Sequence, residues 1–96
     1  MKTVNVAVQI IPIVTENQVN TIVDKAIDVI DKSGIKYKVC PFETVLEGNV
    51  NEIFETIKLA QAACYKAGAK ELITNIKIHS NIERDLKIAD KMEKYS

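Results

Sequence analysis

The sequence predicts an α+β sandwich with the element order βαββαβ, followed by an additional C-terminal helix. Apolar and polar residues alternate in four segments, as in half-buried strands, and apolar residues recur at helical spacing in three others. Glycines and capping-type residues stand at the junctions between these segments. A chain of 96 residues has room for one hydrophobic core, so residues 1–96 are expected to form a single domain.

The first half of the chain predicts a strand, a helix and a second strand. Residues 3–11, "TVNVAVQII", alternate as a strand does. Thr15 and Gln18 have the spacing of a capping box, and Gly34 is placed to end the helix that follows. The apolar residues of this helix recur at helical spacing: Val19, Ile22, Val23, Ala26, Ile27 and Ile30. Residues 35–40 form the second strand, which Pro41 ends because proline cannot donate to a sheet ladder.

The second half repeats this organisation and adds a helix. Residues 42–47, "FETVLE", are predicted to be the third strand, and Asn49 to cap a helix that ends at Gly68. Residues 70–78 are the fourth strand. Ser80 and Glu83 have capping-box spacing, so a final amphipathic helix is expected to begin there. Its apolar side would comprise Ile82, Leu86, Ala89 and Met92.

A weak internal repeat supports two similar βαβ halves. The segments "DKSGIKYKV" (31–39) and "YKAGAKELI" (65–73) both place lysine, glycine and lysine where a helix precedes a strand. Right-handed crossovers leave few topologies for such halves, and the ferredoxin-like sandwich is the leading one. In that fold both helices lie on one face of the sheet, so the other face is open.

The residues expected on the open face are a mixture of apolar, amide and charged side chains. On the first strand they are Asn5, Ala7, Gln9 and Ile11; on the third, Glu43, Val45 and Glu47; on the fourth, Ile73, Asn75 and Lys77. Such a face suits an oligomer interface that contains a pocket. The alternative is a half-solvated sheet face whose glutamates lie in water.

Charge and hydropathy exclude several partner classes. Thirteen basic and thirteen acidic side chains cancel, which argues against a nucleic-acid surface and against binding to an anionic membrane. No apolar run approaches the roughly 20 residues of a membrane span. Cys40 and Cys64 lack metal-site spacing, and a disulfide between them is not expected in a protein of this kind. The expected compartment is the cytoplasm.

Catalytic chemistry is not expected. Glu43 and Glu47 are separated by roughly 13 Å along a strand, which is too far for a typical acid/base pair. His79 is the single histidine, so no catalytic or metal site is predicted. A weaker alternative is an enzyme whose site is shared between subunits, with Glu43 of one chain approaching Glu47 or His79 of another.

Three segments together resemble the thiamine-binding protein family of small ferredoxin-like domains: "VAVQIIPI" (6–13), "SGIKYKVCPFETVLEG" (33–48) and "AGAKELITNIKI" (67–78). The resemblance covers about 85 of 96 residues. Many family members carry a longer Gly/Ser-containing loop after the first strand's proline, whereas here it reads "IVTENQ". That difference bears on affinity and ligand choice if the loop closes over the ligand.

The resemblance implies non-enzymatic binding of thiamine or a related hydroxymethylpyrimidine compound, in a homodimer or homotetramer. An aminopyrimidine edge pairs with carboxylate and amide groups, and the thiazolium ring is cationic. The expected ligand-binding residues are Glu47 and Glu43 as carboxylate partners, and Gln9, Thr44 and Asn75 as neutral partners. Tyr37 is a further candidate for stacking on a ring, with core packing as the alternative. The rival hypothesis is a structural or regulatory oligomeric module without a small-molecule ligand.

Overall fold

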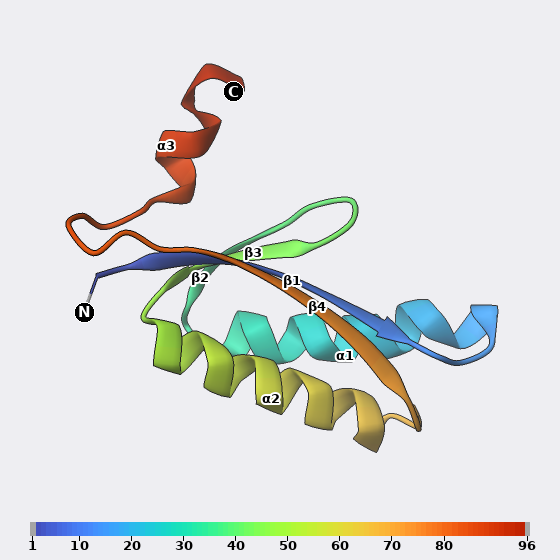
Figure 1. Ribbon diagram of the computed structural model, residues 1–96. Coiled ribbons are helices and arrows are strands. Elements are labelled where there is room, and N and C mark those ends of the chain that lie inside the picture. Colours follow the sequence, from blue (N-terminus) through green and yellow to red (C-terminus); the bar gives the residue numbers. More distant parts are fainter. Residues whose placement is uncertain (1, 96) are drawn as a thin grey trace.

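The computed structural model describes residues 2–95 and has the predicted element order. One antiparallel sheet, in the order β2-β3-β1-β4, is formed by β1 (Val4–Pro12), β2 (Lys36–Val39), β3 (Thr44–Gly48) and β4 (Leu72–His79). Helices α1 (Glu16–Lys32) and α2 (Val50–Lys66) cover one side of this sheet. The short helix α3 (Ile88–Met92) and a 3-10 turn (Glu93–Tyr95) lie on the other side (Figure 1). The fold is therefore the ferredoxin-like sandwich with an additional C-terminal helix.

The core lies between the sheet and the two long helices. Alternate residues of β1 point into it, as predicted, and Val6, Leu46 and Ile53 are completely buried. One buried cluster comprises Val4, Val6, Val8, Ile30, Leu46, Ile53 and Ile57, and the other comprises Ile22, Ala26, Ala60, Cys64 and Ala69. Because the even-numbered residues of β1 supply this core, its odd-numbered residues are left for the open face.

The helix ends follow the sequence signals closely. Asn49 caps α2, its side-chain oxygen accepting hydrogen bonds from the backbone N–H groups of Asn51 and Glu52. Gly34 and Gly68 follow the two long helices with φ of 80° and 117°, a conformation that glycine adopts at little cost. Thr15 is the N-cap residue of α1, as predicted. Its hydroxyl donates to the side chain of Gln18 and accepts no hydrogen bond from a backbone N–H of the helix, so the hydrogen bonds of the predicted capping box are not those observed. In the described part of the chain, no helix is long and apolar enough to cross a membrane.

The third strand is shorter at its start than predicted. Pro41 and Phe42 form the tip of the hairpin between β2 and β3, and the backbone N–H of Cys40 donates to the carbonyl of Glu43 at 2.8 Å. Phe42 is 82% exposed at this tip. Beyond the turn, the predicted alternation holds: Leu46 is buried on the helix side, whereas Val45 and Glu47 belong to the open face.

The prediction of a helix beginning at Ser80 is wrong. Residues 80–87 are not helical, and α3 begins only at Ile88. Long-range contacts replace the helix, because the backbone N–H of Leu86 donates to the carbonyl of Thr3, and the N–H of Thr3 donates to Asp85. The expected apolar stripe is also divided: Leu86 is 3% exposed, whereas Ile82 is 94% exposed.

Candidate functional site

The strand register arranges the open-face side chains in rows that cross the sheet. One row contains Gln9 on β1 and Asn75 on β4, and the β1–β3 register continued by one residue places Glu43 beside Gln9. The middle row runs through Val45, Ala7 and Lys77. A third row consists of Lys36, Glu47, Asn5 and His79. Side chains in adjacent rows of one strand are separated by roughly 7 Å because they are two residues apart.

The first row borders a hollow of about 240 Å³, here called the open-face hollow. Its lining residues are Ala7, Gln9, Glu43, Asn75, Ile76 and Lys77. The side-chain nitrogen of Asn75 donates to the oxygen of Gln9 at 3.2 Å, which orients both amides. Glu43, Gln9 and Asn75, three of the residues predicted from sequence, therefore lie together around one concave surface.

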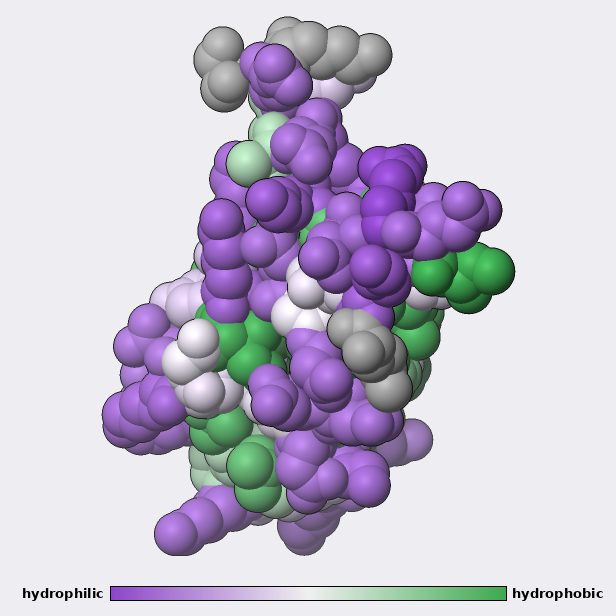
Figure 2. Space-filling model, turned by 90° about the vertical axis from the view of Figure 1, so that its left-hand side faces the viewer, coloured by the Kyte–Doolittle hydropathy of each residue, from purple (hydrophilic) through white to green (hydrophobic). Residues whose placement is uncertain are grey.

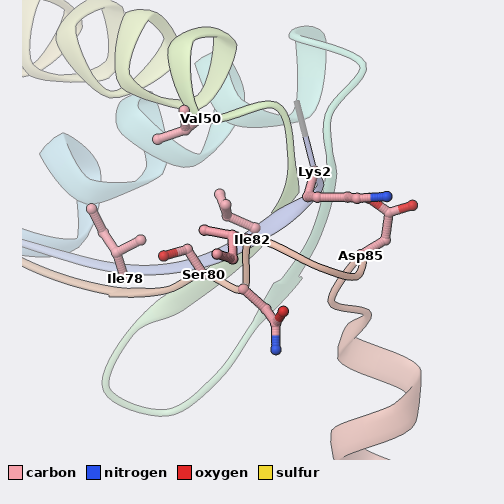
Figure 3. Close-up of a pocket in the computed structure, with 8 residues that line it drawn as sticks. Lys2, Val50, Ile78, Ser80, Ile82 and Asp85 are labelled. Carbon is pink, nitrogen blue, oxygen red and sulfur yellow. The ribbon is translucent and has the colours of Figure 1, made fainter.

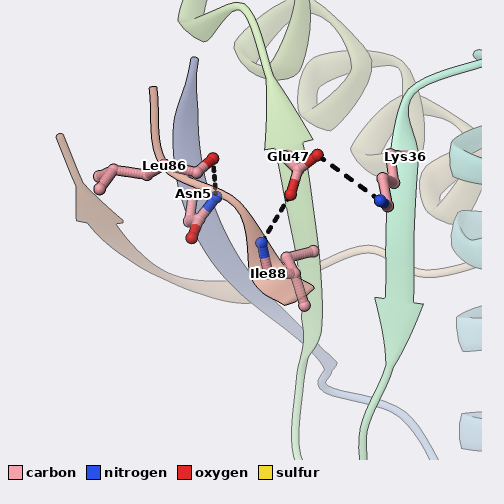
Figure 4. Close-up of polar contacts among 5 residues, drawn as sticks. All are labelled: Asn5, Lys36, Glu47, Leu86 and Ile88. Atoms are coloured by element: carbon pink, nitrogen blue, oxygen red, sulfur yellow. Dashed lines mark hydrogen bonds and ion pairs between the residues drawn. The ribbon is translucent and has the colours of Figure 1, made fainter. Parts of the chain in front are cut away.

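Glu47 has a different environment from Glu43. Its Oε1 accepts a hydrogen bond of 2.6 Å from the backbone N–H of Ile88, and its Oε2 lies 3.8 Å from Nζ of Lys36 (Figure 4). The Glu47 side chain is only 12% exposed. Its carboxylate therefore holds the start of α3 against the open face, and it does not line the open-face hollow.

Asn5 completes this attachment of the C-terminal segment. It is 4% exposed, and its Nδ2 donates to the carbonyl of Leu86 at 3.0 Å (Figure 4). Its Oδ1 accepts a hydrogen bond from Nζ of Lys91. Such a buried amide is stable because both of its ends have partners. We call the segment from Asp85 to Lys91, which Asn5 and Glu47 hold on the open face, the C-terminal strap.

Two other residues predicted from sequence lie on the helix side of the sheet. Thr44 is 7% exposed and opposes Val8 in the register, so it belongs to the core layer. Tyr37 packs on the core, and its hydroxyl donates to Asp31 at 2.7 Å; this hydrogen bond raises the pKa of Tyr37. Neither residue lines the open-face hollow, and for Tyr37 this is the core-packing alternative considered above.

A larger hollow, of about 750 Å³, lies elsewhere and was not foreseen from sequence. It is lined by Lys2, Val4, Val50, Ile78, Ser80, Asn81, Ile82 and Asp85 (Figure 3). On this end of the molecule, hydrophobic residues form small patches among hydrophilic ones (Figure 2). Four of its lining residues, Ser80, Asn81, Ile82 and Asp85, belong to the non-helical segment that the sequence predicted as a helix.

Strand β4 forms one edge of the sheet, and no other strand among residues 2–95 pairs with its outer side. The N–H of Ile13 donates to the carbonyl of Glu71, which lies directly opposite in the β1–β4 register. Bonded and non-bonded pairs alternate in an antiparallel ladder, so the odd-numbered residues of β4 bond to β1. The backbone groups that point away from the sheet are those of Leu72, Thr74, Ile76 and Ile78.

The comparisons of this chain with known proteins agree on one protein family. The model of a family described as "Thiamine-binding protein" matches residues 6–96. A UPF0045 protein of Clostridium perfringens is 38% identical over 78 residues, which cover 81% of this chain and 82% of the relative. A UPF0045 protein of Methanothermobacter thermautotrophicus is 28% identical over 86 residues, covering 88% and 87% of the two chains.

Solved structures agree with the sequence comparisons. The structure of a domain of unknown function, DUF77, from Bacillus cereus has a TM-score of 0.93 and 39% identity, covering 99% of this chain and 91% of that one. A Thermotoga maritima protein, whose name suggests thiamine biosynthesis or salvage, has a TM-score of 0.90 and 28% identity, covering 98% and 99%. The family match extends over nearly the whole chain, and this protein belongs to the thiamine-binding protein family.

Proposed function

We propose that this protein binds thiamine or a related hydroxymethylpyrimidine compound at the open-face hollow, as a binding protein and not as an enzyme. The observation that carries the proposal is the grouping of Glu43, Gln9 and Asn75 around one concave surface. A carboxylate and two amides provide the donors and acceptors that an aminopyrimidine edge requires. Family membership supports the same ligand class.

Glu43 is the carboxylate that we assign to the ligand. It lines the hollow and is partly exposed, whereas the oxygens of Glu47 already have protein partners. Each charge-assisted hydrogen bond contributes about 1.5–3 kcal/mol, so three of them at the upper end of this range approach the about 8.2 kcal/mol of a micromolar Kd. Glu47 keeps a supporting role, because it fixes the strap beside the ligand site.

The proposal includes self-association through the edge of β4. The open-face hollow alone, at about 240 Å³, is below the roughly 300–1,000 Å³ of typical small-molecule sites. A second copy of this chain, related by a twofold axis perpendicular to the sheet, would pair with the outward backbone groups of β4 and provide the missing wall.

A register centred on Asn75 suits such a homodimer. It brings Leu72 opposite the partner's Ile78, and Thr74 opposite the partner's Ile76, so that all four residues with outward backbone groups are paired. Lys77 then faces the partner's Ile73, and no like charges are directly opposed. The hollows of both protomers, each lined by Asn75, would adjoin at the axis. A homotetramer would require a second interface in addition.

The proposed compartment is the cytoplasm. Cys40 and Cys64 are both free thiols, which suits a reducing environment. The pKa of the Cys64 thiol is raised by burial, so this residue behaves as a small apolar core residue.

The test is a thermal-shift and calorimetric titration with thiamine and hydroxymethylpyrimidine. Ligand at 100 times its Kd should stabilise the protein by about 2.7 kcal/mol. Glu43→Gln is expected to weaken binding about tenfold or more, since it removes a charge-assisted interaction worth about 1.5–3 kcal/mol. The matched control is Glu55→Gln, because Glu55 is an exposed carboxylate on α2, which covers the opposite side of the sheet.

The second candidate function is an oligomeric interaction module without a small ligand. The unpaired edge of β4 favours this candidate, because it predicts assembly whether or not a ligand binds. If neither compound shifts the melting temperature while the protein still assembles, this second function replaces the first.

A further inference from the structure

A third hollow, of about 210 Å³, lies where β4 ends and the C-terminal strap crosses the sheet. Its lining residues are His79, Arg84, Leu86, Lys87, Asp90 and Lys91. Three of these carry a permanent positive charge and only Asp90 carries a negative one. This excess is local, since the whole chain has 13 basic and 13 acidic side chains. We call this the cationic hollow.

The backbone that carries these cations is anchored. Leu86 is 3% exposed, its N–H donates to Thr3, and its carbonyl accepts from Asn5. Lys91 is oriented by its own hydrogen bond to Asn5. Glu47 lies in the same row as Asn5 and His79, but its carboxylate is compensated by the N–H of Ile88 and by Lys36. The backbone at Leu86 and Ile88 and the side chain of Lys91 are thus held in place, and Asp90 is the one acid among the residues that line the hollow.

The cationic hollow and the open-face hollow lie on the same face along the same two strands. His79 and Asn75 are four residues apart on β4, as are Asn5 and Gln9 on β1, which corresponds to roughly 13 Å. Ala7 and Lys77 form the row between the two hollows. Ala7 has a short side chain that protrudes little from the sheet, and Lys77 lines the open-face hollow. A molecule of two linked rings with a short phosphorylated side chain has a comparable length.

We propose that the cationic hollow is an anion subsite that takes the phosphate group of a phosphorylated ligand whose ring lies in the open-face hollow. Arg84 is suited to this because its planar guanidinium binds two phosphate oxygens at once, and Lys87 and Lys91 add point charges. His79 contributes a ring N–H from the sheet itself. The inference rests on the proposed function for the ring, but the anion subsite can be tested without it.

The experiment compares thiamine, thiamine monophosphate, thiamine diphosphate and inorganic pyrophosphate as calorimetric titrants. The proteins are the wild type, the double variant Arg84→Gln/Lys87→Gln, and the control Lys58→Gln/Lys66→Gln, whose lysines lie on α2. Arg84 and Lys87 are exposed, so the double variant should keep its fold, which its unliganded melting temperature verifies. Wild type and control should bind thiamine monophosphate at least about tenfold more tightly than thiamine, as expected for a charge-assisted phosphate contact. In the double variant this preference should fall below about threefold while thiamine affinity is retained.

The pyrophosphate titration separates the two proposals. If no thiamine compound binds but pyrophosphate stabilises the wild type and not the double variant, the proposed function fails and the anion subsite stands. If thiamine binds but phosphorylation gives no preference in the wild type, the subsite is refuted and the proposed function stands. A phosphate preference that survives unchanged in the double variant also refutes the subsite.

Discussion

Glu47 accepts a hydrogen bond from the backbone N–H of Ile88, a residue 41 positions later in the chain, at 2.6 Å. This contact joins β3 to the start of α3 across the open face. A carboxylate that sequence reasoning assigned to a ligand therefore has a structural partner. The hydrogen bond explains how Glu47 can lie on a mostly covered part of the sheet, since a buried carboxylate is tolerated when its oxygens have hydrogen-bond partners.

Glu47→Ala should loosen the C-terminal strap. The substitution removes a charge-assisted hydrogen bond, so the free energy of unfolding should fall by about 1.5–3 kcal/mol. Urea denaturation measures the loss, and hydrogen exchange at the Ile88 amide locates it. Lys36→Gln is the matched control: Lys36 is 63% exposed, so its loss should cost about 0–1 kcal/mol. An Ile88 amide that exchanges no faster in Glu47→Ala would contradict this assignment.

Leu86 and Ile82 should respond oppositely to truncation. Leu86→Ala removes a buried side chain and should cost about 2–5 kcal/mol of stability, whereas Ile82→Ala should change it by less than about 0.5 kcal/mol. The two residues belong to one apolar stripe in the helix that the sequence predicts from Ser80. Equal effects of the two substitutions on the denaturation midpoint would favour that helix over the loop.

The difference between prediction and structure here has a physical cause. Strand and helix periodicity is a local property of the sequence. It was therefore possible to predict β1, both long helices, and the side of the sheet on which Gln9, Glu43 and Asn75 lie. The path of residues 80–87 depends on hydrogen bonds to Thr3 and Asn5, more than 80 positions away, which no local pattern reveals. The cationic hollow depends on the same path, because His79, Arg84, Lys87 and Lys91 meet only when the chain crosses the sheet.

The Asp85 carboxylate should give the strap a pH dependence in the acidic range. Its pKa is lowered, chiefly by the hydrogen bond from the N–H of Thr3, so the charged form is favoured in the folded state. The resulting stabilisation is present above the unfolded-state pKa of about 3.9 and is lost as the pH falls through the lower folded-state value. The stability difference between wild type and Asp85→Asn should therefore shrink on going from neutral pH to about pH 3. The same difference at both pH values would show that this carboxylate does not contribute.

Ile76→Pro should prevent pairing at the edge of β4. The N–H of Ile76 points away from the sheet, so its loss removes no bond to β1, but it removes a donor at the centre of the proposed interface. Sedimentation equilibrium should show the wild type as a dimer or larger and the variant as a folded monomer. Ile76→Val is the control that keeps the donor. A variant that remains folded and assembles like the wild type would exclude this edge as the interface.

Ala7→Leu should separate the two hollows of the open face. Ala7 lies between Val45 and Lys77 in the register, and its side chain is the smallest in the path from the open-face hollow to the cationic hollow. The larger side chain there obstructs a ligand that spans both hollows, so the affinity for thiamine monophosphate should fall about tenfold or more, a loss of about 1.4 kcal/mol or more of binding free energy. Pyrophosphate, which occupies only the cationic hollow, should bind as it does to the wild type. If the affinities for thiamine monophosphate and pyrophosphate fall together, the substitution has deformed the sheet. If neither affinity falls, the ligand does not cross Ala7, and the proposal that one ligand spans both hollows is refuted.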